Sequence, residues 1–149
     1  MTVLHVLFSV GNAEYVLPAS EVLHMESFSS ATRVPGAQPH VIGLVQVRSR
    51  VVPVVDLRLR FGLPAIAPTV DSRVLVVQRG QRVVALLADC AREVLRIDPG
   101  QFHPPPELVV EQAAGFVTQV AELGKRLVML IDTGAVIGEE PEYGEHERQ

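Results

Sequence analysis

The stretch RVVPVVD, at residues 50–56, returns as RLVMLID at residues 126–132, and this repetition decides the fold. A second pair of segments, EVLHM at residues 21–25 and EVLRI at residues 93–97, occurs in the same order in the two halves. The offset is 72 residues for the EVL pair and 76 residues for the other pair. Because self-similarity at a fixed period marks a repeated structural unit, the chain is predicted to contain two copies of one module of roughly 70 residues.

Each module is predicted to be built of β-hairpins. Most periodic segments are short, rich in valine and leucine, and bounded by glycine or polar residues. Turns are predicted at residues 11–12, 48–50, 80–81 and 124–125, which gives two hairpins per half. With the EVL segment crossing between them, each module has about five strands, so we predict an all-β fold of two small barrels. Short helical turns are expected only after Asp56 and Asp132, whose carboxylates can cap free backbone N–H groups.

Composition indicates a compact cytoplasmic protein. Hydrophobic residues make up 48% of the 149 residues, yet no apolar run approaches the roughly 20 residues of a membrane helix. The first ten residues lack the basic start and the small-residue cleavage site of a signal peptide. The single cysteine, Cys90, excludes an internal disulfide and fits a reducing compartment. We predict that its side chain fills space, although the adjacent Asp89 leaves an activated thiol as the alternative.

The net negative charge belongs to the C-terminal tail. Residues 139–149, EEPEYGEHERQ, hold five acids and one arginine, which leaves 12 acids and 12 bases in the rest of the chain. Such a polar segment cannot bury enough apolar surface to offset its ordering entropy, so we expect an acidic disordered tail. The neutral body has no basic cluster interleaved with aromatic residues, which disfavours nucleic-acid binding.

Motifs for catalysis or for cofactor binding are absent from the sequence. There is no G-x-S-x-G, no phosphate-binding G-x-x-x-x-G-K-[ST], no G-x-G-x-x-G, and no C-x-x-C or H-E-x-x-H ligand set. The five histidines are scattered without ligand spacing. We therefore predict no catalytic residue, no cofactor and no metal site, and keep a small metabolic enzyme or a ligand-binding β-barrel as the alternative function.

The most distinctive stretch is GLVQVRSRVVPVVDLRLRFGL, at residues 43–63. Strand alternation places Arg48 at the end of a hairpin whose other face is apolar, with Arg58 and Arg60 nearby. These arginines are either solubilising surface or planar donors that recognise a carboxylate or carbonyl of a partner. Pro53 cannot donate to a ladder, so its strand is predicted to be an edge or a bulged strand, whereas the equivalent Met129 carries no such restriction.

These residues resemble the central signature of the CheW-like chemotaxis coupling family. The similarity rests on Gly43-Leu44, Arg48, PVVDLR at residues 53–58 and Gly62-Leu63. It continues through RVVALLADCAREVL at residues 82–95, the prolines before Glu107, and LGKRLVMLID at residues 123–132, so that it covers about residues 3–138.

The resemblance implies a single domain, residues 1–138, made of two SH3-like five-stranded barrels side by side. The first barrel is expected at about 13–68 and the second at about 69–138, and it stays open whether a strand at 2–11 is shared. The resemblance also implies a non-catalytic adaptor that links the cytoplasmic tip of a chemoreceptor to the regulatory domain of a histidine kinase. No kinase, receiver or phosphotransfer segment fits within 149 residues, so a free-standing coupler remains.

The resemblance implies two partner surfaces. Val22 and Met25 are expected in an apolar groove that receives the helical hairpin of a receptor, with core filling as the alternative for both. Arg48, Arg58 and Arg60 are expected at the interface with the kinase or another partner.

The chain departs from the family pattern at three places. Ser49 stands where the turn commonly has glycine, and Gln119 also replaces a usual glycine. His24 stands where an acid commonly serves as partner for the turn arginine, and Glu21 or Glu26 could take over that role.

Overall fold

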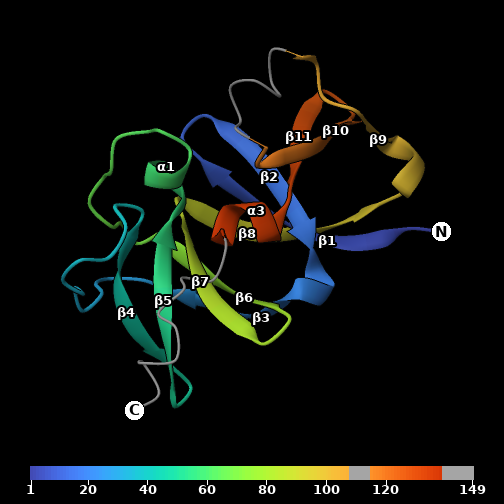
Figure 1. The fold of residues 1–149 in the computed structure, drawn as a ribbon. Coiled ribbons are helices and arrows are strands. Elements are labelled where there is room, and N and C mark those ends of the chain that lie inside the picture. Colours follow the sequence, from blue (N-terminus) through green and yellow to red (C-terminus); the bar gives the residue numbers. More distant parts are fainter. Residues whose placement is uncertain (108–114, 139–149) are drawn as a thin grey trace.

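The computed structural model describes residues 1–107 and 115–138, and strands dominate this part of the chain (Figure 1). The strands are β1 (Val3–Val10), β2 (Ala13–Pro18), β3 (Val22–Ser27), β4 (Val41–Val47), β5 (Arg50–Asp56), β6 (Arg73–Arg79), β7 (Arg82–Ala88), β8 (Cys90–Ile97), β9 (Phe102–His103), β10 (Val117–Leu123) and β11 (Arg126–Ile131). The helices are the 3-10 turns η1 (Ala19–Glu21) and η2 (Pro99–Gln101) and the short α-helices α1 (Leu57–Arg60) and α3 (Thr133–Ile137). No helix in the described ranges is long and apolar enough to cross a membrane.

The strands form two sheets that lie side by side (Figure 1). The six-stranded sheet has the order β8-β1-β2-β11-β10-β9, and the five-stranded sheet has the order β3-β6-β7-β5-β4. The predicted all-β fold with short helical turns after Asp56 and Asp132 is therefore confirmed. The four predicted turns, at residues 11–12, 48–50, 80–81 and 124–125, are also confirmed.

Each sheet takes strands from both halves of the chain. In the five-stranded sheet β3 pairs with β6, and in the six-stranded sheet β8 pairs with β1. The sheets therefore do not follow the expected boundary near residue 68, because β2 belongs to the six-stranded sheet and β6 and β7 belong to the five-stranded one. The sequence repeat is visible in the strand pairing. In each copy the last strand runs parallel to a hairpin strand of the other copy: β5 pairs with β7, and β11 pairs with β2.

Among residues 1–107 and 115–138, three apolar clusters hold the sheets. One lies within the five-stranded sheet and includes Phe28, Val54 and Val76, and another lies within the six-stranded sheet and includes Leu7 and Ile97. The largest cluster combines residues of both sheets and joins them. Its buried members include Phe8, Leu17, Leu57, Leu75, Val77, Leu86 and Ile131. Burying this much apolar area is the dominant favourable term in folding, so the two lobes stabilise each other.

Pro53 lies in β5, which is an interior strand, so of the two predicted alternatives the edge strand was wrong. The β4–β5 ladder does shift its register, on the β4 side between Val41 and Gly43. Leu44 exchanges both of its outer backbone hydrogen bonds with Thr32, at 2.9 and 2.8 Å. The pair Leu44–Pro53 in the β4–β5 ladder is therefore a non-hydrogen-bonded pair, which needs no N–H from Pro53. Pairing with β7 begins only at Val54. The proline thus fits because neither neighbouring strand needs its nitrogen.

The tail at residues 139–149 lies outside the described residues, so its expected disorder stays a prediction.

Candidate partner-binding site

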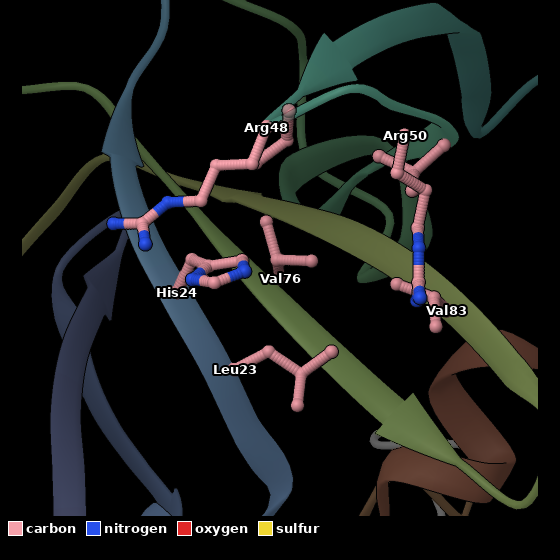
Figure 2. A pocket seen from close by; sticks show the side chains of 8 residues that line it. Leu23, His24, Arg48, Arg50, Val76 and Val83 are labelled. Atoms are coloured by element: carbon pink, nitrogen blue, oxygen red, sulfur yellow. The ribbon is translucent and has the colours of Figure 1, made fainter.

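A pocket of about 200 Å³ opens at one end of the five-stranded sheet, and all five strands or their turns contribute to it (Figure 2). Its lining residues are Leu23, His24, Val47, Arg48, Arg50, Val52, Val76 and Val83. Figure 2 shows the side chains of Arg48 and Arg50 on opposite sides of the pocket, with His24, Val76 and Leu23 between them. An apolar floor and two guanidinium groups suit an apolar side chain of a partner that stands beside a carboxylate.

The turn that carries Arg48 is strained. Arg48 has φ 49° and Ser49 has φ 71°, and they are the two non-glycine residues with positive φ in the described ranges. A two-residue hairpin turn of this hand favours Asn-Gly or Gly-Gly, because a Cβ is unfavourable in the left-handed region. The structure therefore forms the turn expected at Arg48 despite the replacement of glycine by Ser49. Strain of this kind is concentrated at functional sites.

Within the described residues, the acid at ion-pair distance from Arg48 is Glu26. The Nη2 of Arg48 lies 4.0 Å from the Oε2 of Glu26, and the two side chains are 65% and 37% exposed. An ion pair this long and this exposed contributes little to stability. Of the two acids that could replace the acid missing at His24, Glu26 is the one near Arg48, whereas Glu21 accepts a hydrogen bond from Thr133. Arg48 thus keeps most of its donors available to another molecule.

Strand β3 presents different side chains on its two faces. Val22 pairs with Val77 and Met25 pairs with Leu75, and both partners belong to the cluster that joins the sheets. Val22 and Met25 are half-buried against this cluster. His24 pairs instead with Val76, on the face of the arginine pocket. The ladder shifts between Val22 and His24, so the irregularity in β3 separates the two surfaces.

Arg58 lies away from the arginine pocket, in α1, and binds inside the chain. Its Nε and Nη2 each lie 2.9 Å from an oxygen of Asp89, and its Nη1 donates to Pro64 O at 3.3 Å. The hydrogen bond with Asp89 raises the pKa of Arg58. Asp56 caps α1 by accepting from the Arg58 N–H, while burial raises the pKa of the Asp56 carboxyl. These contacts use the donors of Arg58 within the chain.

Arg60 also binds inside the chain. Its Nε donates to Val136 O at 2.8 Å and its Nη2 donates to Ala135 O at 3.1 Å. Its guanidinium carbon lies 4.8 Å from the ring centroid of Phe116, which is a cation–π distance. The structure therefore brings Arg58 and Arg60 together in α1 and leaves Arg48 apart, at the pocket.

Four residues of the pocket were not predicted as site residues from the sequence: Leu23, Arg50, Val76 and Val83. Leu23 is 41% exposed and lines the pocket. The bulge in β3 directs it toward the pocket, and a bulge leaves no reliable pattern in one sequence. In residues 1–107 and 115–138, no group of three or more potential ligands is placed to hold a metal ion. The pocket volume is also below the roughly 300–1,000 Å³ of typical small-molecule sites.

Comparisons with known proteins match the chain to one family. A sequence model described as the CheW-like domain matches residues 4–140. The chemotaxis protein CheW of Bacillus subtilis is 30% identical over 135 residues, which is 91% of this chain and 86% of the relative. The CheW of Klebsiella aerogenes is 29% identical over 134 residues, 90% of this chain and 81% of the relative.

A solved structure shows the same fold. The crystal structure of the scaffolding protein TtCheW from Thermoanaerobacter tengcongensis superposes with a TM-score of 0.83 at 27% identity. The match covers 91% of this chain and 92% of that chain, so the likeness includes both SH3-like β lobes. The chain belongs to the CheW-like domain family.

Proposed function

We propose that this chain is a non-catalytic adaptor of a chemotaxis-type pathway, which couples the cytoplasmic tip of a chemoreceptor to the regulatory domain of a histidine kinase. Family membership supports the adaptor role, because the relatives are named chemotaxis and scaffolding proteins. Adaptor work needs surfaces that bind proteins and does not need a reactive group. An adaptor with these partners acts in the cytoplasm.

The observation that carries the proposal is the pair of surfaces on β3. One face presents the half-buried Val22 and Met25, and the other face leads to the pocket of Leu23, His24 and Arg48. Since β3 is the edge of its sheet, a partner can reach both faces without breaking a ladder. A helical hairpin inserts apolar residues at i, i+3 and i+4 into such a groove.

The receptor groove is assigned to the apolar face. Val22 and Met25 continue the cluster that joins the two sheets, so a helix seated there contacts both lobes. The arginine pocket is assigned to the kinase or to an acidic margin of the receptor, because guanidinium groups favour carboxylates. Of the three arginines expected at this interface, Arg48 carries the proposal, because Arg58 and Arg60 are bound within the chain.

Receptor binding is tested with Val22→Asp. A carboxylate at position 22 loses its water when an apolar helix docks over it, which costs several kcal/mol, so affinity for a purified receptor tip is expected to fall strongly. Leu127→Asp is the matched control, since Leu127 is 57% exposed on β11 and is already in contact with water. Calorimetric titration is run beside circular dichroism of each variant. Unchanged binding by folded Val22→Asp would exclude this groove, and no binding by the wild-type protein to any receptor tip or kinase domain would refute the adaptor role.

A further inference from the structure

The two helices that follow the repeated aspartates contact each other and are not alike. Asp56 and Asp132 occupy equivalent positions and both cap a helix, through the N–H groups of Arg58 and Ala135. The first helix continues with LRLRF at residues 57–61, whereas the second continues with TGAVI at residues 133–137. The first copy therefore presents arginine donors at the place where the second copy presents small and apolar residues.

The arginines of the five-stranded lobe bind the backbone of the second helix. The last carbonyl groups of a helix have no partner within it. In α3 the carbonyls of Ala135 and Val136 accept from Arg60, and the carbonyl of Gly138, the residue that follows the helix, accepts from Arg82 Nη1 at 2.6 Å. Guanidinium groups are also favourable at the negative end of a helix. The C-terminal end of α3 is thus capped by side chains from the other lobe.

Aromatic and apolar contacts support the same junction. Phe61, directly after α1, lies with its ring 5.0 Å from the ring of Tyr15 and 5.6 Å from that of Phe116, and both belong to the six-stranded lobe. Val136 and Ile137 of α3 are buried in the cluster that joins the sheets. A Cβ at Gly134 would lie 3.4 Å from the guanidinium carbon of Arg79, so the small residue leaves room for a further arginine.

We propose that Arg60 is a positioning residue, which with Arg82 and the C-terminal carbonyls of α3 forms a latch that fixes the angle between the two lobes. The divergence of the two copies then has a physical reason: one helix became the donor and the other the acceptor. This step rests on the proposed adaptor function: the latch holds the surface at Val22 and Met25 in the shape that a partner in contact with both lobes requires. Arg60 acts through this geometry and need not touch a partner.

The angle between the lobes is measured first, without any partner. Spin labels are attached to cysteines introduced at Gln46 and Glu122, which are exposed on β4 and β10, in a Cys90→Ser background. Pulsed electron resonance is expected to give a narrow distance distribution for the parent protein, a broader or shifted one for Arg60→Ala, and an intermediate one for Arg60→Lys, which keeps the charge with fewer donors. Arg48→Ala is the control and should leave the distribution unchanged.

A folded Arg60→Ala protein with the parental distribution would overturn the latch. If Arg60→Ala does not fold, Arg60→Lys and Arg82→Ala decide by the same measurement, because each removes only part of the contact. The second readout is affinity for the receptor tip, which Arg60→Ala should weaken by roughly fivefold or more, whereas Arg33→Ala, at an exposed loop arginine, should not change it. If the wild-type protein binds no receptor tip, the adaptor proposal fails, while the distance measurement still decides the latch.

Discussion

The guanidinium of Arg58 holds the carboxylate of Asp89 through two nitrogens, each 2.9 Å from an oxygen, at the point where the chain passes from β7 to β8. The same carboxylate accepts from the Gly11 N–H at 2.8 Å, and the Asp89 N–H donates to Ser9 O at 2.9 Å. Asp89 therefore joins α1 in one lobe to β1 and the β1–β2 turn in the other. A two-pronged pair of this kind is stronger than a single hydrogen bond.

Arg58→Ala is expected to lower the free energy of unfolding by about 2–3 kcal/mol, because it leaves a largely buried carboxylate with fewer donors. Arg92→Ala is the matched control, since Arg92 pairs with Asp71 at an exposed position and should cost less than about 1 kcal/mol. Urea unfolding of the two variants checks this. Equal losses would show that Arg58–Asp89 behaves as a surface pair.

Gly43→Ala is expected to be much more destabilising than Gly36→Ala. Both glycines have positive φ, 152° and 78°, so an added Cβ strains either backbone by about 1–2 kcal/mol. At Gly36 the Cβ would meet nothing within 4 Å, whereas at Gly43 it would lie 2.3 Å from the carbonyl oxygen of Thr32. That clash breaks the bridge between Thr32 and Leu44, so the loss should exceed about 3 kcal/mol. The denaturant midpoints of the two variants measure both losses of stability. Similar midpoints would mean that the loop around Thr32 shifts freely.

Local features could be predicted from the sequence, and non-local ones could not. The hairpin turns and the Asp56 and Asp132 caps depend on residues within a few positions of each other, and all were predicted. The exchange of strands between sheets depends on β3 pairing with β6, about 50 residues away, and two similar modules make either partner equally plausible. An arginine that binds a partner and an arginine that binds a carbonyl group of its own chain look alike in the sequence. The intramolecular contacts of Arg58 and Arg60 could therefore be found only from the structure.

Ser49→Gly is expected to stabilise the protein by about 0.5–1 kcal/mol. Relief of the strain at φ 71° outweighs the extra freedom that glycine gives to the unfolded chain. The equivalent turn of the second copy places Gly124, with φ 66°, at the position of Arg48, so Gly124→Ser puts a Cβ in the left-handed region there and should destabilise the protein by a similar amount. Thermal and urea unfolding of Ser49→Gly and of Gly124→Ser test these two expectations. A loss of stability in Ser49→Gly would mean that the Ser49 side chain makes a compensating contact.

The free energy of unfolding of Asp56→Asn, relative to that of the wild-type protein, is expected to increase as the pH rises. Burial raises the pKa of Asp56, against the hydrogen bonds from the N–H groups of Arg58 and Leu59. At a pH between the pKa of Asp56 in the unfolded state and its raised pKa in the folded state, the folded protein binds more protons than the unfolded protein. The free energy of unfolding of the wild-type protein therefore falls as the pH rises through that window. Asparagine does not titrate and still offers an oxygen to the Arg58 N–H. Urea unfolding from about pH 3 to about pH 6 should show the difference growing in favour of the variant, and a constant difference would contradict the assigned cause.

Arg48→Glu is expected to weaken partner association by roughly 1–3 kcal/mol while changing stability by less than about 1 kcal/mol, because Arg48 is exposed and its contact with Glu26 is long. Arg48→Glu combined with Glu26→Arg separates two explanations, since this exchange restores the ion pair within the chain but leaves position 48 negative. If the pair with Glu26 is what matters, the exchanged protein should regain full affinity. If Arg48 binds a carboxylate of the partner, affinity should remain low. Calorimetric titrations against the receptor tip and against the kinase regulatory domain, measured separately with urea unfolding of each variant, identify the partner that the pocket serves. Unchanged affinity for both partners together with a large loss of stability would make Arg48 a structural residue of the β4–β5 hairpin.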